Sequence, residues 1–400
     1  MPAYRYRAVH ASGRIAKGSI SAANENELAH HLSHSGLELI EAHICKNPYP
    51  PLQFRLQPHT LTLFTGQLLE LLRAKVPFVE AVRNVQGATS AGPLRDALAA
   101  VLSDIEHGSR IGAAFARHPR IFPPVFISIL AAGDISGDLT ATFEHLMRYT
   151  ESRARLNDQL RRALRYPLFL LCITFAVTAF MMSAVVPKII GFLNTIDSQL
   201  PLATRVLISV SEFFSKEWLI FLLTGAILSL TVAFLRRTSE KIGIAVDALL
   251  LRLPVIGGLL KKLALARFVS SFAILFHSNV GIPAGLRGAR ATLGNRYLEM
   301  KVKEAERQVI NGSPLSSAVM GLLPVFAIHI LLTGERSGRL GRSLDDIAAT
   351  YEREVSEDSQ KLVGALEPTL TLLIGGMLAW IVLAILGPIY GSVAKLGGMG

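Results

Sequence analysis

Few residues of this sequence stand at spacings that could support chemistry. Glu144, Glu151 and Asp158 lie along one predicted helix, where their carboxylates could hold a divalent cation. A hard cation takes about six to eight oxygen ligands, which is more than this spacing gathers. Arginines in the same stretch offer surface salt bridges instead. We therefore favour ion pairs for these carboxylates and keep a cation site as the alternative.

Two histidines raise a second metal-site hypothesis. His30 and His34 lie one turn apart in a helix predicted over residues 25–35. No acidic or cysteine ligand clearly joins them, so we interpret them as part of a solvated face. Catalytic motifs are equally scarce, because the chain contains no Gly-Lys pair, no H-E-x-x-H, no C-x-x-C and no G-x-S-x-G. The sequence predicts a protein that is not an enzyme and needs no cofactor.

The elements that would position a site occur twice. The segment GERSGRL at residues 334–340 nearly repeats GDISGDL at residues 133–139, a spacing of 201 residues (334 − 133). The flanking pairs also match: Val76-Pro77 with Ile282-Pro283, Gly108-Ser109 with Gly312-Ser313, and Phe122-Pro123 with Leu323-Pro324. The chain therefore contains one unit twice, a helical domain followed by a hydrophobic segment.

Apolar residues at helical spacing predict short amphipathic helices within the first unit. They are expected at residues 60–72, 79–85, 94–105 and 111–115, separated by proline and glycine breaks. Short amphipathic helices pack naturally as a bundle. The repeated seven-residue segment is then expected to join two helices of that bundle.

Four glycines of the repeated segment are candidate structural turn residues. Gly133, Gly137, Gly334 and Gly338 are expected to supply positive φ, with one helix ending at Gly133 and the next starting a few residues later. Each copy also carries an acidic residue, which a turn does not require. The acid could contact a partner or another domain, and a purely local role is the equal alternative.

Composition points to a membrane protein. Hydrophobic residues make up 50% of the chain, charged residues only 18%, and the mean hydropathy is +0.41. Uncharged runs at residues 166–187, 218–235 and 368–394 are long enough for a bilayer core of about 30 Å. The predicted fold is an all-α membrane protein with two repeated cytoplasmic helical-bundle domains, three transmembrane helices and a small α/β N-terminal domain.

Basic residues set the predicted orientation. The formal net charge of +11 is concentrated beside the apolar runs, as the positive-inside rule expects, so we do not expect nucleic-acid binding. The bundles at residues 59–165 and 236–367 are therefore predicted to be cytoplasmic. Residues 188–217 and the tail at residues 395–400 are predicted to be periplasmic.

The N-terminal part is predicted to form a separate small domain. Residues 1–45 are predicted to form two short strands, one helix and a third strand. They show no signal peptide, so the N-terminus is expected to stay in the cytoplasm. Residues 46–58 contain several prolines and are predicted to be a linker.

The predicted spans contain no Asp, Glu, Lys, Arg or His. Ion pathways and proton relays normally need buried ionisable groups, so a transporter is disfavoured, as is a membrane enzyme. Gly387 and Gly391 form a small-xxx-small pair in the third span, which is a candidate for helix packing. The alternative is that glycine is simply common in membrane helices.

These motifs together resemble one known family, the inner-membrane platform proteins of type II secretion and type IV pilus assembly. The resemblance covers nearly the whole chain and includes both G-[ED]-x-S-G-x-L segments. Further matching motifs are Val76-Pro77, Tyr166-Pro167, Val186-Pro187, Leu200-Pro201, Glu367-Pro368 and the segment RLPVIG at residues 252–257. Asp134 stands where the family usually has Glu, and Lys75 stands where a glycine commonly precedes Val-Pro.

The resemblance implies a bacterial inner-membrane protein with a cytoplasmic N-terminus and a periplasmic C-terminus. It implies contacts with a cytoplasmic secretion ATPase, other inner-membrane assembly proteins, pseudopilins or pilins, the lipid bilayer and further copies of this chain. The candidate partner or interdomain contacts are the acids of the repeated segment and arginines near the spans: Asp134, Glu335, Arg161, Arg162, Arg236 and Arg237.

Overall fold

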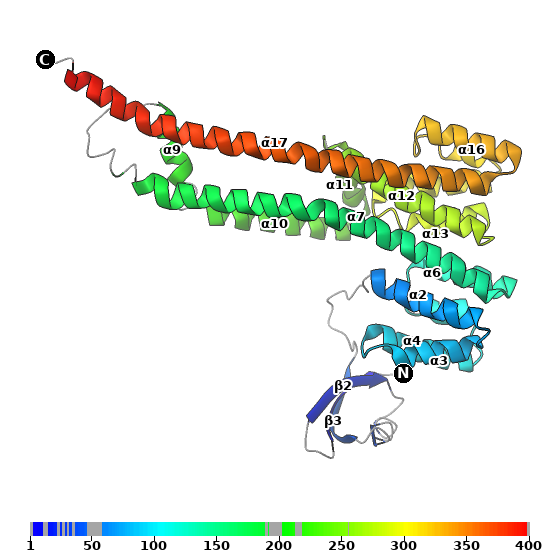
Figure 1. Ribbon diagram of the computed structural model, residues 1–400. Helices are drawn as coiled ribbons and strands as arrows, with labels where there is room; N and C mark the ends of the chain where they lie inside the picture. The colour runs from blue at the N-terminus through cyan, green and yellow to red at the C-terminus, as the bar shows by residue number, and fades with distance from the viewer. Residues whose placement is uncertain are drawn as a thin grey trace. The chain divides into compact units, whose positions relative to one another are not determined.

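The computed structural model divides the chain into two units, Met1–Leu56 and Gln57–Gly400 (Figure 1). It describes residues 3–10, 15–21, 25, 29, 32, 33, 37–45, 58–188, 191, 202–212, 218–254 and 256–397.

The first unit contains a three-stranded antiparallel sheet in the order β2-β1-β3. The strands are β1 (Ala3–His10), β2 (Ile15–Ser21) and β3 (Leu37–Cys45). Ala8 and Leu32 are buried and form its small core, while Arg7 is exposed, as the alternation of strand residues requires. The predicted strands are confirmed. Most of the predicted helix, including His30 and His34, lies outside the described residues.

The second unit contains the same succession of six helices twice. The first copy comprises α2 (Pro58–Arg73), α3 (Phe78–Ala88), α4 (Pro93–Glu106), α5 (Ile111–Ala116), α6 (Pro124–Ser136) and α7 (Leu139–Phe180). The second copy comprises α12 (Ile256–His277), α13 (Ile282–Arg290), α14 (Arg296–Ile310), α15 (Leu315–Ala318), α16 (Val325–Ser337) and α17 (Leu340–Gly397). The repeat inferred from the sequence is thus a repeat in structure, and the four helices predicted before α6 are confirmed.

The first helix of each copy ends in the same kind of turn. Lys75 and Asn279 both adopt the left-handed conformation, with φ of 61° and 56°. The Val76 N–H donates to the Leu71 carbonyl at 3.0 Å, and the equivalent bond follows Asn279. This is the Schellman arrangement, in which glycine is the usual left-handed residue.

Each bundle buries its own apolar core. In the first copy, Phe115 and Phe122 are fully buried with ring centroids 4.6 Å apart, and Phe126 packs 5.4 Å from Phe122. In the second copy, Phe268 and Phe272 of α12 are almost fully buried. These aromatic side chains supply much of the apolar area that leaves water when the bundles fold.

The two copies also contact each other, since α7 packs against α12 and α17. The Glu352 Oε1 accepts hydrogen bonds from Ser152 across this contact at 2.9 Å and from Ser270 at 3.3 Å. Arg267 donates to Asn157 at 3.3 Å. The bundles are therefore joined by packed helices and by polar contacts.

The long helices α7 and α17 run from a bundle directly into an apolar segment (Figure 1). Pro167 lies inside α7 and does not end it, although the sequence places the start of a separate span there. Proline removes one backbone donor, and a helix tolerates this where neighbouring groups satisfy the freed carbonyl. Among the described residues, Arg165–Lys188 and Leu340–Ala384 are long and apolar enough to cross a membrane.

The described residues between the copies include three more helices: α9 (Leu202–Glu212), α10 (Trp218–Thr238) and α11 (Glu240–Arg252). The predicted second span falls in α10, where Leu223–Arg236 forms a shorter apolar helix. The bent pair of α11 and α12 also has the length and composition of a span. Residues of α12 such as Phe268 are buried in the bundle, so we assign α12 to the core.

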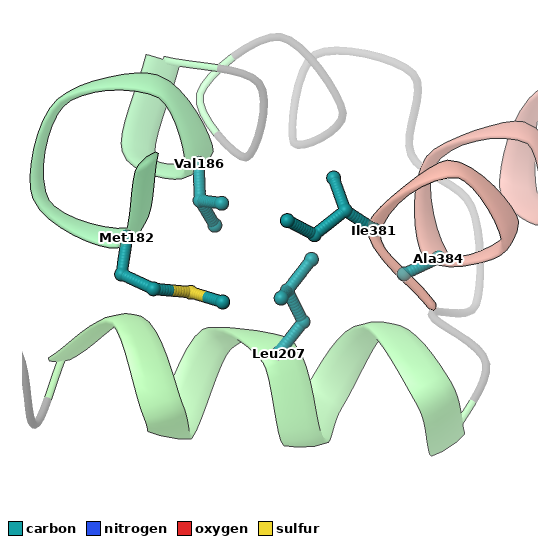
Figure 2. Packing of buried hydrophobic residues seen from close by; sticks show 5 residues of the cluster. All are labelled: Met182, Val186, Leu207, Ile381 and Ala384. Carbon is teal, nitrogen blue, oxygen red and sulfur yellow. The ribbon is translucent and has the colours of Figure 1, made fainter. Parts of the chain in front are cut away.

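A short π-helical segment, η1 (Met181–Val185), continues α7. Met182 and Val186 point toward Leu207 of α9 and toward Ile381 and Ala384 of α17, and these five side chains form a buried cluster (Figure 2). Ser211 of α9 also donates to the Met182 carbonyl at 2.6 Å. This hydroxyl ties α9 to the backbone of the π-helical segment.

Candidate functional site: the repeated turn

In both copies the turn joins the last short helix to the long one. Gly137 follows α6 with a φ of 76°, and Gly338 follows α16 with a φ of 68°. The positive φ predicted for these two glycines is confirmed. Asp138 then caps α7, because its Oδ1 accepts the Ala141 N–H at 2.9 Å.

Gly133 and Gly334 have a different reason to be glycine. Both lie within a helix and neither has a positive φ, so the prediction of left-handed backbone is wrong for them. A methyl group on Gly133 would lie 2.8 Å from the Thr142 Cβ, and one on Gly334 would lie 2.8 Å from the Ser343 Cβ. The absent side chain lets the first turn of the long helix cross close over the short helix.

The acid that follows each buried glycine reaches back across its own bundle. The Asp134 Oδ2 accepts the Gly112 N–H at 2.6 Å, at the start of α5. The Glu335 Oε1 accepts the Leu315 N–H at 2.5 Å, and its Oε2 accepts the Ser316 N–H at 3.1 Å, at the start of α15. A carboxylate at a helix N-terminus satisfies free amides and interacts favourably with the helix dipole.

The turn therefore ties three helices of each bundle together. Glycine permits the close crossing of two of them, and the acid fastens the third. These three hydrogen bonds of Asp134 and Glu335 lie within their own bundle. A role for these two acids in binding a partner stays a prediction.

The two copies present different surfaces around this shared framework. Three exposed arginines of the second copy occupy the places of uncharged or acidic residues in the first: Arg336 for Ile135, Arg339 for Asp138 and Arg342 for Ala141. A shallow groove beside the second turn is lined by residues that include Arg339, Arg342, His329 and Asp346. The second turn thus offers positive charge that the first does not.

Arg236, at the end of α10, lies in an ion pair inside the chain. Its Nη2 is 2.8 Å from the Oδ1 of Asp247, whose side chain is fully buried, although this pair is not aligned as a hydrogen bond. The Asp247 Oδ2 accepts the Arg296 N–H at 2.7 Å, and Arg296 donates to the Arg236 carbonyl at 2.5 Å. Burial raises the pKa of the neighbouring Glu299, against the opposing charge of Arg290. The structure places Arg236 at a junction of α10, α11 and α14.

For the other predicted contact and packing residues, the structure describes no contact that would reveal a role. Arg161 and Arg162 are exposed on α7 just before the apolar segment. The side chain of Arg237 lies outside the described part of α10. Gly387 and Gly391 fall within α17, where the packing around them is outside what the structure describes. Their roles stay predictions.

The carboxylates along α7 have partners on another helix. Glu144 accepts a hydrogen bond from Arg73 of α2 at 2.9 Å, and Asp158 lies 3.0 Å from His59 of the same helix. The sequence had indicated ion pairs with arginines of the same helix. The structure instead places these partners on α2. Within the described ranges, no group of three or more His, Cys, Asp or Glu side chains is placed to hold a metal ion.

Several of these contacts were not predicted from the sequence. Thr142 and Ser343 occupy equivalent positions of the repeat, 201 residues apart (343 − 142). Two small hydroxyl residues at equivalent positions could have indicated the close contacts with Gly133 and Gly334. Asp247 was detectable as a lone acid in the apolar stretch GIAVDALLL at residues 243–251. Its partners Arg236 and Arg296 could not be paired with it from the sequence, because only the fold brings them together.

Comparison with known proteins also detects the duplicated unit in this chain. The family described as "Type II secretion system (T2SS), protein F" matches residues 64–187 and 268–388, so its unit is found twice, each time from the bundle into the apolar helix. The N-terminal domain of the same family matches residues 1–43. The chain belongs to the type II secretion system protein F family. The resemblance inferred from the motifs is confirmed.

Relatives from both branches of the family align over nearly the whole chain. Type II secretion system protein F of Vibrio cholerae is 30% identical over 398 residues, which cover 97% of this chain and 98% of that protein. Type IV pilus assembly protein PilC of Thermus thermophilus is 29% identical over 408 residues, which cover 99% of each. Type II secretion system protein F of Aeromonas hydrophila is 33% identical over 334 residues, covering 82% of this chain and 85% of the relative.

Proposed function

We propose that this family member is the inner-membrane platform of a type II secretion or type IV pilus machine. It couples a cytoplasmic ATPase to the assembly of pseudopilins or pilins and does not itself catalyse a reaction. The observation that supports this role best is the continuity of α7 and α17, each of which runs from a bundle into a segment long enough to cross a membrane. A displacement of either bundle is transmitted along a rigid helix into the bilayer.

The proposed topology has three spans, with α10 as the second. The apolar side chains of α10 are exposed around the helix, including Ile220, Leu228 and Phe234 at 62%, 67% and 70%. Such a helix is unfavourable in water and favourable in lipid. Both bundles and the N-terminal unit face the cytoplasm, and residues 188–217 and 395–400 face the periplasm.

The arginines around the second turn are the proposed contact for an acidic face of the ATPase. Arg336, Arg339 and Arg342 are exposed, and they have no counterparts in the first copy, so they distinguish one bundle from the other. Charge complementarity mainly sets the partner and the association rate. Other inner-membrane assembly proteins and further copies of this chain complete the proposed assembly.

The test is co-purification of the ATPase with the full chain from membranes of its own host. The wild type and the single control variants Arg95→Glu and Lys303→Glu, at exposed positions outside the turn, are expected to retain the ATPase. The triple change of Arg336, Arg339 and Arg342 to Glu is expected to lose it and to stop assembly. A wild-type chain that retains no ATPase would contradict the coupling, and a triple variant that retains it would contradict the arginine contact.

A further inference from the structure

The helix α11, which follows α10 and precedes α12, carries an exposed apolar stripe. Ile242, Leu249 and Leu253 are exposed by 37%, 65% and 43%. Leu249 and Leu253 follow Ile242 by seven and eleven residues, so the three side chains share one face of the helix. The exposed Ala245 lies on the same face. A soluble surface helix would normally carry polar residues there.

The opposite face of α11 is fixed. Asp247 is fully buried and held by Arg236 and by the backbone of Arg296. A methyl group on Gly243 would lie 2.9 Å from the Arg296 Cδ, so this face packs closely against α14. Leaving the buried Asp247 carboxylate without its partners is costly, and α11 therefore cannot rotate to bury its apolar stripe.

The direction of α11 brings this stripe toward a bilayer surface. α11 begins two residues after α10 ends, and the chain bends by 114° between α11 and α12. α12 packs along α17, whose later part is a candidate span (Figure 1). If α17 crosses the bilayer, a helix that turns by 114° from α12 runs close to the plane of the membrane.

The charges beside the stripe suit a lipid surface. Lys241 and Arg252 are exposed at the two ends of α11, and Lys261 is exposed on α12 near the exposed Leu260. An apolar helix face bordered by basic residues is the pattern of a helix lying in the headgroup region of an anionic bilayer. Continuity with the lipid-facing α10 favours lipid over a protein as the occupant.

We infer that α11 is an interfacial helix whose apolar stripe inserts into the cytoplasmic leaflet. Such helices lie about 5–10 Å into the boundary between headgroups and acyl chains. This inference rests on the proposed topology. Through Asp247, Arg236 and Arg296 the helix is locked to both α10 and α14, so its contact with lipid sets the orientation of the second bundle against the membrane.

Three leucines of nearly equal exposure allow a matched test in the full chain. Leu249 of α11 is 65% exposed, Leu63 of α2 is 67% exposed and Leu228 of α10 is 67% exposed. Each is changed to Cys, one at a time, in a chain whose Cys45 and Cys172 are replaced by Ala, and is labelled with an environment-sensitive dye. The protein is reconstituted in phosphatidylethanolamine and phosphatidylglycerol vesicles that contain lipids spin-labelled at shallow or deep positions.

The dye at Leu249→Cys is expected to be quenched several-fold more by the shallow spin label than the dye at Leu63→Cys. The dye at Leu228→Cys is expected to respond to the deep label. Equal access of a water-soluble quencher to the dyes at Leu249→Cys and Leu63→Cys, with Leu228→Cys still quenched deeply, would overturn the interfacial helix alone. Loss of deep quenching at Leu228→Cys would overturn the proposed topology.

A second copy of the chain is the competing occupant of the stripe. Protection of the dye at Leu249→Cys that disappears when the protein is diluted in excess lipid would indicate such a contact and would overturn the inference. Shallow quenching that is unchanged by dilution supports the interfacial helix.

Discussion

The carboxylate of Glu335 holds the backbone of Leu315, accepting its N–H at 2.5 Å, and thereby fastens the start of α15 to the turn between α16 and α17. Asp134 makes the equivalent contact with Gly112 in the first copy. The two acids stand at the same place in the repeat, although three exposed positions around the turn differ in charge between the copies. Their shared contact therefore accounts for an acid at this position without any partner.

Replacing Glu335 by Ala should destabilise the protein. The change leaves two amides at the start of α15 without their acceptor, and an unpaired buried polar group costs about 1–3 kcal/mol. Glu335→Gln keeps one acceptor oxygen and should lose less. We expect the melting temperature of the detergent-solubilised protein to fall in the order wild type, Glu335→Gln, Glu335→Ala. A Glu335→Ala variant that melts like the wild type but fails in assembly would show that Glu335 serves a partner instead.

Substitution of the two glycines of the second turn should lower the stability of the protein for different reasons. Gly334→Ala places a methyl group against the Ser343 Cβ, so Ser343→Gly should rescue it. Gly338→Ala forces a left-handed conformation on an L-residue, at a cost of about 1–2 kcal/mol, and Ser343→Gly should give no rescue. A double-mutant cycle on thermal unfolding separates the two cases. Equal coupling of Ser343→Gly to both glycine changes would contradict the assignment.

The repeat could be predicted from matching segments 201 residues apart, and the helices of the first bundle and the turn could be predicted from local spacing. Proline and glycine mark helix ends wherever the backbone must leave the helix, as at Gly137 and Gly338. Gly133 was misjudged because glycine also serves close approach, and only the fold shows that Thr142 crosses over it.

Contacts between distant segments were beyond the sequence. The pairing of Asp247 with Arg236 and Arg296 depends on how three helices meet. Pro167 was expected to open a separate helix, yet α7 continues through it, because a helix in a packed or apolar setting tolerates a lost donor. The hydrogen bond that the Asp134 carboxylate accepts from the Gly112 N–H was likewise not predictable, since Gly112 lies 22 residues away in the sequence.

Lys75 should be a site where glycine stabilises the protein. Its φ of 61° is unfavourable for an L-residue with a Cβ by about 1–2 kcal/mol, and glycine avoids this cost. Asn279, at the equivalent turn, has a residue type that adopts this conformation more readily, because a short polar side chain can hydrogen-bond to the local backbone. We expect Lys75→Gly to raise the melting temperature more than Asn279→Gly does. A fall in melting temperature for Lys75→Gly would show that the lysine side chain stabilises the turn by another contact.

The proposed topology predicts which positions an impermeant thiol reagent can reach. With Cys45 and Cys172 replaced by Ala, single cysteines at Ser198 and at Gly398 in the tail should react from the periplasmic side of intact spheroplasts. Cysteines at Ser90 and Ser313, in the loops of the two bundles, should react only after the membrane is opened. Labelling of the bundle cysteines in sealed spheroplasts would contradict the three-span arrangement.

His145 should make the protein less stable in mild acid. Burial lowers its pKa below the ordinary value of 6.5, and the charge of Arg148, which donates to the His145 Nδ1 at 2.5 Å, lowers it further. As the pH falls through about 6.5, the unfolded chain takes up a proton that the folded chain resists, so the free energy of unfolding decreases.

His145→Gln removes this proton uptake while keeping an acceptor for Arg148. We expect the drop in melting temperature between about pH 7.5 and about pH 5.5 to be smaller in this variant than in the wild type. His329→Gln, at an exposed position, controls for the loss of an imidazole. His118, whose pKa is also lowered by burial, should contribute in the same direction, so the double variant His118→Gln/His145→Gln should show the smallest drop. An equal drop in the wild type and the His145→Gln variant would mean that the folded chain protonates His145 as readily as the unfolded chain does.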